Sequence, residues 1–258
     1  MIKYTKLFIS MKSLKEFLNE SLKLKNNVLE WDPSSKGIMK SSFGKTKKLE
    51  PYVTTLKTTK GPVKAYSMFK RGDEITPEIL KAIKKRSSEI SIDDVAYSNL
   101  VNRGAIYINK ILKSINPDVI ITPQSSSSFN NDILNRYREM NPSIKMFFGA
   151  IYKNPNLHEL KFDNVKGFNE KTVANQENDL LKFAKAGEFQ MKKVHPKFRP
   201  YIRNWLKLDP SIEKHVINKN IVIFDDYLTS GASLMESANQ LFDAGADTVT
   251  AITYLHKL

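Results

Sequence analysis

The sequence predicts an α/β protein whose core is a parallel sheet. Three short apolar runs lack polar alternation, which is typical of strands buried on both faces of a parallel sheet. These runs are residues 118–122, 144–150 and 221–224. A loop of small or hydroxylated residues and then an amphipathic helical pattern follow the first and the third run. Strands that alternate with helices in this way indicate an α/β architecture.

The N-terminal region is predicted to add a smaller α+β extension. Residues 11–24 have an amphipathic helical pattern that opens with capping-box spacing, and residues 26–48 are polar and read as a linker or loosely ordered arm. Residues 52–56 and 63–69 are β-branched and aromatic runs separated by a Lys-Gly-Pro turn, so we expect a hairpin. Two further helices are expected, at residues 76–83 and 93–114.

The C-terminal half supplies the remaining elements. Helical patterns occupy residues 129–140, 172–193 and 234–242, and a final strand is expected at 247–254. An interval of about 70 residues separates the strand at 144–150 from the one at 221–224, so we expect a helical insertion there. The expected organisation is a helix and basic arm at 1–50, then one domain at 51–258 with a hairpin and helices (51–115), a core (116–150 and 219–258) and an insertion or hood (151–218).

Composition limits the classes of function. The chain has 258 residues and no cysteine, which excludes disulfides and thiolate chemistry and fits a reducing compartment. No apolar run approaches the roughly 18 residues of a membrane span, and residues 1–10 do not read as a signal peptide. The formal charge of +14 is compatible with a nucleic-acid partner, but no motif supports one, and a Lys-rich composition explains the charge equally well.

One stretch carries a chemical signature. Asp225 and Asp226 directly follow the apolar run at 221–224, where the carboxyl end of a strand is expected. Thr229, Ser230, Gly231, Ala232 and Ser233 then lead into the helix at 234–242. Backbone N–H groups in such a loop, together with the positive end of the helix dipole, suit a phosphate, and paired acids suit vicinal hydroxyls or a divalent metal. The stretch therefore indicates a sugar-phosphate ligand. The alternative is an ordinary turn before a helix.

This stretch, FDDYLTSGAS, resembles the phosphoribosyl-pyrophosphate (PRPP) motif of type I phosphoribosyltransferases. The resemblance implies that Asp225 and Asp226 contact the ribose, with a role in catalysis and in holding Mg²⁺ directly or through water. It implies that Thr229 to Ser233 bind the 5-phosphate. Members of the family that use hypoxanthine or guanine have Asp where this chain has Thr229, so the resemblance argues against that subgroup and leaves the acceptor open.

A serine-rich loop provides a second anion-binding candidate. Gln124, Ser125, Ser126, Ser127 and Ser128 follow the apolar run at 118–122 and supply hydroxyls and amides without bulk. By the same resemblance this is the pyrophosphate loop, although the family's version is richer in Gly. The alternative is a plain serine-rich connection.

The resemblance as a whole implies a phosphoribosyltransferase-like fold and an enzyme of the pentosyltransferase class. Such an enzyme uses PRPP and Mg²⁺, transfers phosphoribosyl to a nitrogenous base or related acceptor, and releases pyrophosphate. It is compatible with a homodimer, with no membrane partner and with a cytoplasmic location. The alternative is a non-catalytic protein on the same fold that binds PRPP or a nucleotide and acts as a regulator or inside a phage head.

The phage alternative comes from a second resemblance. MKSLKEFLNES, which begins at Met11, is similar to the head-targeting peptides of internal proteins of T4-type bacteriophages. Those peptides are cut after an apolar-x-Glu triplet, so the resemblance implies cleavage after Glu20 and packaging in a phage head. An ordinary amphipathic helix is the alternative.

Overall fold

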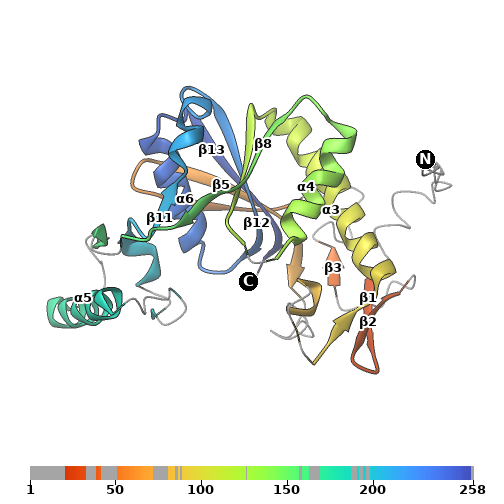
Figure 1. Cartoon of the computed structure of the whole chain (residues 1–258), viewed down its shortest axis with the longest axis horizontal. Coiled ribbons are helices and arrows are strands. Elements are labelled where there is room, and N and C mark those ends of the chain that lie inside the picture. The colour runs from red at the N-terminus through yellow and green to blue at the C-terminus, as the bar shows by residue number, and fades with distance from the viewer. Residues whose placement is uncertain are drawn as a thin grey trace.

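An eight-stranded, mostly parallel sheet forms the centre of the computed structural model (Figure 1). The structure describes residues 21–32, 39–41, 51–71, 81–84, 87, 89–125, 127–156, 159–162, 169–186, 191, 194–195 and 198–256. The strands run in the order β11-β8-β7-β12-β13-β5-β3, with β4 also paired to β5. Their bounds are β3 (Met39–Ser41), β4 (Tyr52–Lys57), β5 (Pro62–Arg71), β7 (Val119–Pro123), β8 (Lys145–Lys153), β11 (Leu206–Leu208), β12 (Asn220–Leu228) and β13 (Thr248–His256).

The five inner strands of this sheet are parallel to one another. The pairs β7–β8, β7–β12, β12–β13 and β13–β5 are all parallel, whereas β11 at one edge and β3 and β4 at the other pair antiparallel. The α/β class that the unalternating apolar runs predicted is therefore confirmed.

Helices cover both faces of the sheet. The helices α3 (Asp94–Ile115) and α4 (Phe129–Met140) lie on one face, and α6 (Ala232–Asp243) lies on the other (Figure 1). In β12, Val222 and Phe224 are buried in the core under α3 and α4, while Ile221 and Ile223 are buried in the core under α6. Because successive side chains of a strand point to opposite faces, a strand between two helical layers must be apolar at every position.

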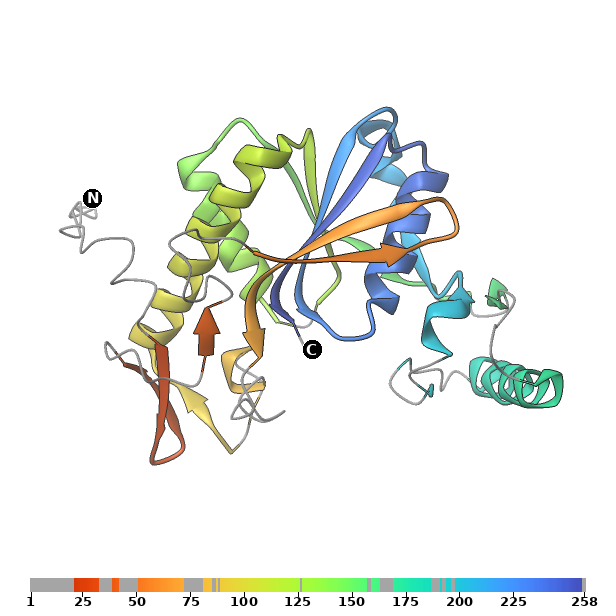
Figure 2. The same cartoon turned by 180° about the vertical axis from the view of Figure 1, so that it is seen from behind.

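Several local predictions are confirmed by the structure. The predicted hairpin forms from β4 and β5, and its turn is closed by a bond from the Thr58 hydroxyl to the Gly61 carbonyl at 2.7 Å. Figure 2 shows this hairpin, in orange, reaching towards α6. The helix predicted at 93–114 is α3, whose N-cap Asp93 accepts the N–H of Val95 at 2.6 Å. The helix predicted at 129–140 has those bounds in the structure.

The N-terminal prediction is wrong where the structure describes it. The helix expected to reach residue 24 is replaced over its end by β1 (Ser21–Lys25), which pairs with β2 (Val28–Asp32) inside the expected arm; β2 also pairs with β6 (Ser91–Ile92). Leucine and lysine alternate with period two in β1, which suits a strand. Asn26 and Asn27 adopt positive φ angles of 49° and 60°, as a two-residue hairpin turn requires.

The insertion contributes to the sheet. It contains β9 (Lys161–Phe162), α5 (Glu170–Lys185), the 3₁₀ helices η3 (Arg199–Tyr201) and η4 (Pro210–His215), and β10 (Ile202–Arg203). It then returns as β11, which pairs with the end of β8 at residues 151–153. Residues 151–153 and 206–208 therefore belong to the sheet, although we had assigned them to the insertion. The helix predicted at 172–193 is shorter at its C-terminal end, and Figure 1 shows α5 projecting away from the sheet.

Some predictions lie outside the described residues. They are residues 11–20 with the cleavage site after Glu20, most of the helix expected at 76–83, and Ser126. Residues 81–83 are helical.

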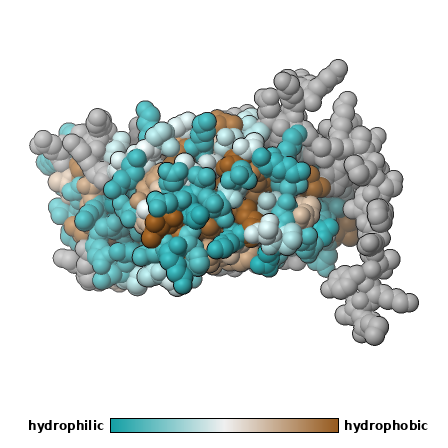
Figure 3. Space-filling view, turned by 90° about the horizontal axis from the view of Figure 1, so that it is seen from above, coloured by the Kyte–Doolittle hydropathy of each residue, from teal (hydrophilic) through white to brown (hydrophobic). Residues whose placement is uncertain are grey.

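The described surface carries scattered apolar side chains. In Figure 3 the face seen from above is mostly hydrophilic with separate hydrophobic patches. The large apolar side chains with the greatest exposure lie on different elements, and such isolated exposure is normal; they are Val53, Val95, Met140, Phe183 and Ile217. Within the described part of the chain, every helix is too short or too polar to span a bilayer.

Candidate functional site

The serine-rich loop begins beside the acid pair at one edge of the sheet. In the β7–β12 pair, Ile121 lies opposite Ile223, which brings Pro123 level with Asp225. The sequence predicts the acids at the carboxyl end of this strand, but β12 continues to Leu228, because its last residues still pair with β13. The loop at 229–233 therefore begins further along β12 than the acid pair and the start of the serine-rich loop.

The acid pair is tightly bonded within the protein. The Asp226 N–H donates to Asp225 Oδ1 at 2.8 Å, and the Lys84 Nζ lies 2.6 Å from Asp226 Oδ2. Burial and, second, the charge of the Asp226 carboxylate raise the pKa of Asp225 to about 7, although the Asp226 N–H, the Lys84 charge and the Asn130 side chain oppose this shift. Titratable groups with shifted pKa values in a concave site are typical of functional centres.

The loop after β12 lines a cavity. Gly231 adopts a φ of 74°, the left-handed conformation, directly before α6 begins at Ala232. The first N–H groups of a helix have no intrahelical acceptor, so they face the loop side. The cavity has a volume of about 60 Å³ and is lined by residues 227–234 with Asp225, Met191 and Arg199.

The hydroxyls of Ser125, Ser127 and Ser128 are engaged in bonds within the chain. Ser127 is buried, and its hydroxyl donates to the Lys84 carbonyl at 3.0 Å and accepts the Phe129 N–H at 3.3 Å. The Ser125 hydroxyl accepts the Ser127 N–H at 3.1 Å, and the Ser128 hydroxyl donates to Asp132 at 2.8 Å. Gln124, Ser125 and Ser128 are exposed. None of the described residues of this loop lines the cavity.

A bulge in β8 lies beside the start of the serine-rich loop. Ile121 pairs with Phe147 but Pro123 pairs with Ile151, so β8 carries extra residues at this point. Gly149, at a φ of 65°, donates its N–H to the Thr122 hydroxyl at 2.9 Å. Bulges are frequent next to active sites, and the Gly within the apolar run at 144–150 was the sequence signal for this one.

Sequence reasoning missed two residues that the structure brings to the site. Lys84 links the serine-rich loop to the acid pair, since its carbonyl accepts the Ser127 hydroxyl and its ammonium pairs with Asp226. Nothing in its local sequence marks it. Arg199, in the insertion, lines the cavity together with Ser230 and Gly231. Phe198 and Trp205, on either side of Arg199 in the sequence, are buried in the core.

The site offers few metal ligands. The described residues include no group of three or more His, Cys, Asp or Glu side chains arranged to hold a metal ion. Asp225 and Asp226 supply hard carboxylate oxygens, which Mg²⁺ prefers together with water and phosphate oxygens.

Comparisons with known proteins found distant structural similarity only. No protein-family model matches the chain, and no curated protein matches it. A solved structure described as a glutamic acid mutant from an analysis of an invariant aspartic acid in HPRTs aligns with a TM-score of 0.35 at 13% identity, covering 62% of this chain and 75% of that one. The purine phosphoribosyltransferase from Pyrococcus horikoshii aligns with a TM-score of 0.33 at 16% identity, covering 62% of this chain and 83% of that one. The hypoxanthine phosphoribosyl transferase from Trypanosoma cruzi aligns with a TM-score of 0.33 at 13% identity, covering 62% of this chain and 72% of that one. Similarity this weak does not assign the chain to a family, so a function has to be argued from the chain's own residues.

Proposed function

We propose that this protein is a phosphoribosyltransferase-like enzyme that transfers the phosphoribosyl group of PRPP to a nitrogenous base or related acceptor. The observation that carries the proposal is that the acid pair lies beside the serine-rich loop, while the loop at 229–233 follows the end of the same strand. The loop at 124–128 and the loop at 229–233 follow neighbouring parallel strands, and Asp225 and Asp226 stand between them. PRPP has a phosphate at one end, pyrophosphate at the other and a ribose with free hydroxyls between them. Its groups therefore match the order of the two loops and the acid pair.

Each group has a role in the proposed reaction. The amides and hydroxyls at 229–233 would hold the 5-phosphate, and the amides at 124–128 would hold pyrophosphate. The carboxylates of Asp225 and Asp226 would accept bonds from the ribose hydroxyls and stabilise positive charge on the ring. An acceptor nitrogen forms the new bond to the anomeric carbon and loses its proton to water. The bond from that carbon to pyrophosphate breaks, and its electron pair leaves with pyrophosphate.

The two aspartates also suit a Mg²⁺ ion that enters the site already bound to the substrate. Asp226, directly or through water, and Asp225 would hold the ion against the pyrophosphate oxygens. When bound, the ion would neutralise charge on the leaving group. Lys84 Nζ is already paired with Asp226 Oδ2, so Mg²⁺ would have to displace the ammonium before it could bind this oxygen.

That ion pair also favours a second candidate, a non-catalytic module that binds PRPP or a nucleotide. A carboxylate already neutralised by Lys84 is less available to the substrate, and the hydroxyls of Ser127 and Ser128 donate to acceptors within the protein. A regulator needs only the phosphate-binding loop and not the complete set of groups.

Pyrophosphate release tests the proposal. The full chain is mixed with PRPP, Mg²⁺ and a panel of purine, pyrimidine and pyridine bases, and pyrophosphate is measured with time. We expect release with at least one base, and a loss of about 100-fold or more in Asp226→Asn. PRPP binding by calorimetry without release would support the module. Absence of PRPP binding would contradict both.

We further propose that the protein acts in the cytoplasm of a host cell or is packaged in a phage head. A chain beginning at Ser21 in purified particles would support processing after Glu20. Particles that contain only the uncut chain would contradict processing.

A further inference from the structure

The insertion closes one side of the cavity next to the 229–233 loop. Arg199, at the start of η3, lines the cavity, and of the described residues that line it Arg199 is the one cation. Its side chain is half-buried, and its Nε donates to the Val194 carbonyl at 2.9 Å. This bond fixes the plane of the guanidinium, so its position at the cavity is defined and not that of a flexible surface side chain.

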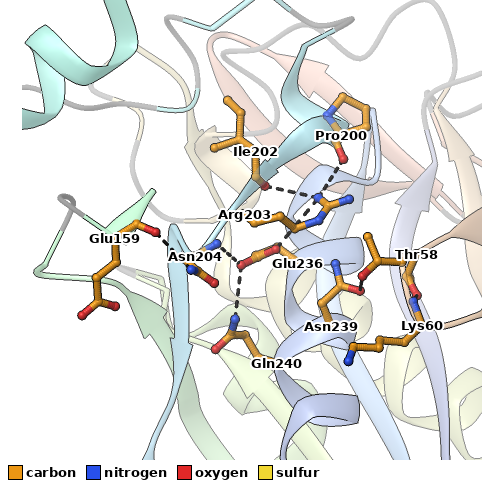
Figure 4. A network of polar contacts seen from close by, with 11 residues as sticks. Thr58, Lys60, Glu159, Pro200, Ile202, Arg203, Asn204, Glu236, Asn239 and Gln240 are labelled. Atoms are coloured by element: carbon orange, nitrogen blue, oxygen red, sulfur yellow. Dashed lines mark hydrogen bonds and ion pairs between the residues drawn. The ribbon is translucent and has the colours of Figure 1, made fainter. Parts of the chain in front are cut away.

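A buried carboxylate clamps this part of the insertion onto α6 (Figure 4). Glu236 of α6 is fully buried, and its Oε1 accepts the Asn204 N–H at 2.6 Å. Its Oε2 lies 4.0 Å from Arg203 Nη1, and that same Nη1 donates to the Pro200 carbonyl at 2.7 Å. Pro200 is the neighbour of Arg199 in the chain. A continuous set of contacts therefore runs from Glu236 through Arg203 to the residue next to Arg199.

The same helix serves both sides of the cavity. α6 begins at Ala232, within the 229–233 loop, and Glu236 lies about one turn further along. The helix that directs its N–H groups towards the cavity thus also holds the segment that carries Arg199. α6 therefore contributes both a part of the cavity wall and a contact to the segment that carries Arg199.

We propose that Arg199 is a binding residue for a phosphate monoester held in the cavity next to the 229–233 loop, and that Glu236 is the positioning residue that keeps Arg199 there. The inference rests on the proposed function, which puts a sugar phosphate in this loop. A guanidinium binds phosphate oxygens through paired N–H donors, which a loop of amides alone does not provide. The ligand class is a sugar 5-phosphate whose phosphate is a dianion.

Calorimetry with ribose 5-phosphate tests the role of Arg199. We expect Arg199→Ala to weaken binding about 10- to 100-fold, as removal of a charged hydrogen-bond donor does, and Arg199→Lys to recover part of the loss. Arg136→Ala, which removes an exposed arginine from α4, is the matched control and should leave the affinity unchanged. Equal affinity of Arg199→Ala and the unaltered protein would overturn the inference while leaving the proposed function intact. If the unaltered protein binds neither ribose 5-phosphate nor PRPP, both fall.

A double-mutant cycle tests the positioning role. If Glu236 acts through Arg199, Glu236→Gln weakens ribose 5-phosphate binding in the unaltered background and causes no further loss in the Arg199→Ala background. A purely structural role would give the same loss in both backgrounds. Arg203→Lys, which keeps the Glu236 side chain and the positive charge beside it but removes the guanidinium bond to Pro200, provides a second variant should Glu236→Gln unfold. It should show the same dependence on Arg199, and additive losses in both cycles would overturn the positioning role.

Discussion

Lys84 Nζ lies 2.6 Å from Asp226 Oδ2, and this ion pair ties the segment before α3 to the end of β12. The two side chains are 22% and 15% exposed, so the pair is largely shielded from water. The Lys84 carbonyl also accepts the Ser127 hydroxyl. One residue therefore connects the acid pair with the serine-rich loop, and it stands where a ligand of Asp226 would bind.

Replacing Lys84 by Met should affect stability and ligand binding in opposite directions. Asp226 loses its counter-charge in a half-buried place, so we expect the free energy of unfolding to fall by about 1–2 kcal/mol. Mg²⁺-dependent PRPP binding should become tighter, because the ligand no longer competes with the ammonium. Urea denaturation and calorimetry measure the two effects.

Lys60→Met is the matched control for the stability effect. Lys60 pairs with Asp243 at 3.0 Å, but both side chains are more than half exposed, so its loss should cost about 0.5 kcal/mol or less. Equal costs for the two variants would show that the Lys84 pair has no special role in stability. Weaker PRPP binding by Lys84→Met would mean that Lys84 assists the ligand instead of competing with it.

Glu236 should make stability depend on pH. Burial raises the pKa of Glu236 to about 7 from the ordinary value of 4.5, and the Asn204 N–H and the Arg203 charge only partly oppose this shift. Between pH 4.5 and 7 the folded protein holds a proton that the unfolded chain releases, so stability falls as the pH rises. Glu236→Gln removes this titration. Its free energy of unfolding relative to the unaltered protein should increase by about 1–3 kcal/mol between pH 5 and pH 8 in urea titrations.

The exposed Glu213, replaced by Gln, controls for the loss of one negative charge. A difference between Glu236→Gln and the unaltered protein that stays constant with pH would exclude the raised pKa as the cause. Some dependence on pH should remain in the variant, because burial raises the pKa of Asp225 in the same direction.

Gly231→Ala should damage the loop at the cavity. An L-residue at a φ of 74° costs about 1–2 kcal/mol. The added Cβ would also come within 2.7 Å of Leu56 Cδ2, in the hairpin that packs on the loop. We expect a stability loss of about 1–3 kcal/mol together with weaker ribose 5-phosphate binding, measured by thermal unfolding and calorimetry.

The variant Leu56→Ala with Gly231→Ala separates the two causes. If the contact with Leu56 matters, Gly231→Ala costs less in the Leu56→Ala background than in the unaltered protein. If only the backbone conformation matters, the cost is the same in both. No stability loss in either background would contradict the left-handed conformation at this position.

Gly104→Ala tests the packing of α3 against α4. Alanine normally stabilises a helix by about 1 kcal/mol relative to glycine. Here the new Cβ would lie 2.9 Å from Ile133 Cδ1, and both residues are buried, so we expect a net loss of about 1–3 kcal/mol in urea denaturation. Ile133→Val removes that methyl group and should restore part of the loss. If Gly104→Ala is more stable than the unaltered protein, the α3–α4 interface accommodates the added methyl group without a loss of packing.

The apolar character of particular strands was enough to predict the core. Residues 221–224 are apolar on consecutive positions because β12 is buried between two helical layers, and that pattern needs no tertiary information to recognise. The same holds for the strand at 118–122 and for the helices at 93–114 and 129–140. Ser21–Lys25 was misread because a leucine repeat is shared by helical and strand patterns over a short segment, and only pairing with β2 distinguishes them.

The sequence by itself determined where the loop at 229–233 and the acid pair stand along the chain, since residue type and order within residues 221–233 express local chemistry. Only the tertiary structure decided which distant residues meet them: Lys84 on Asp226, Arg199 at the cavity, and Glu236 beneath the insertion. Such pairings depend on the order of the strands in the sheet and on the connections between them. Contacts between residues more than 30 positions apart leave no periodic trace in the sequence, because each partner on its own resembles an ordinary surface or helical residue.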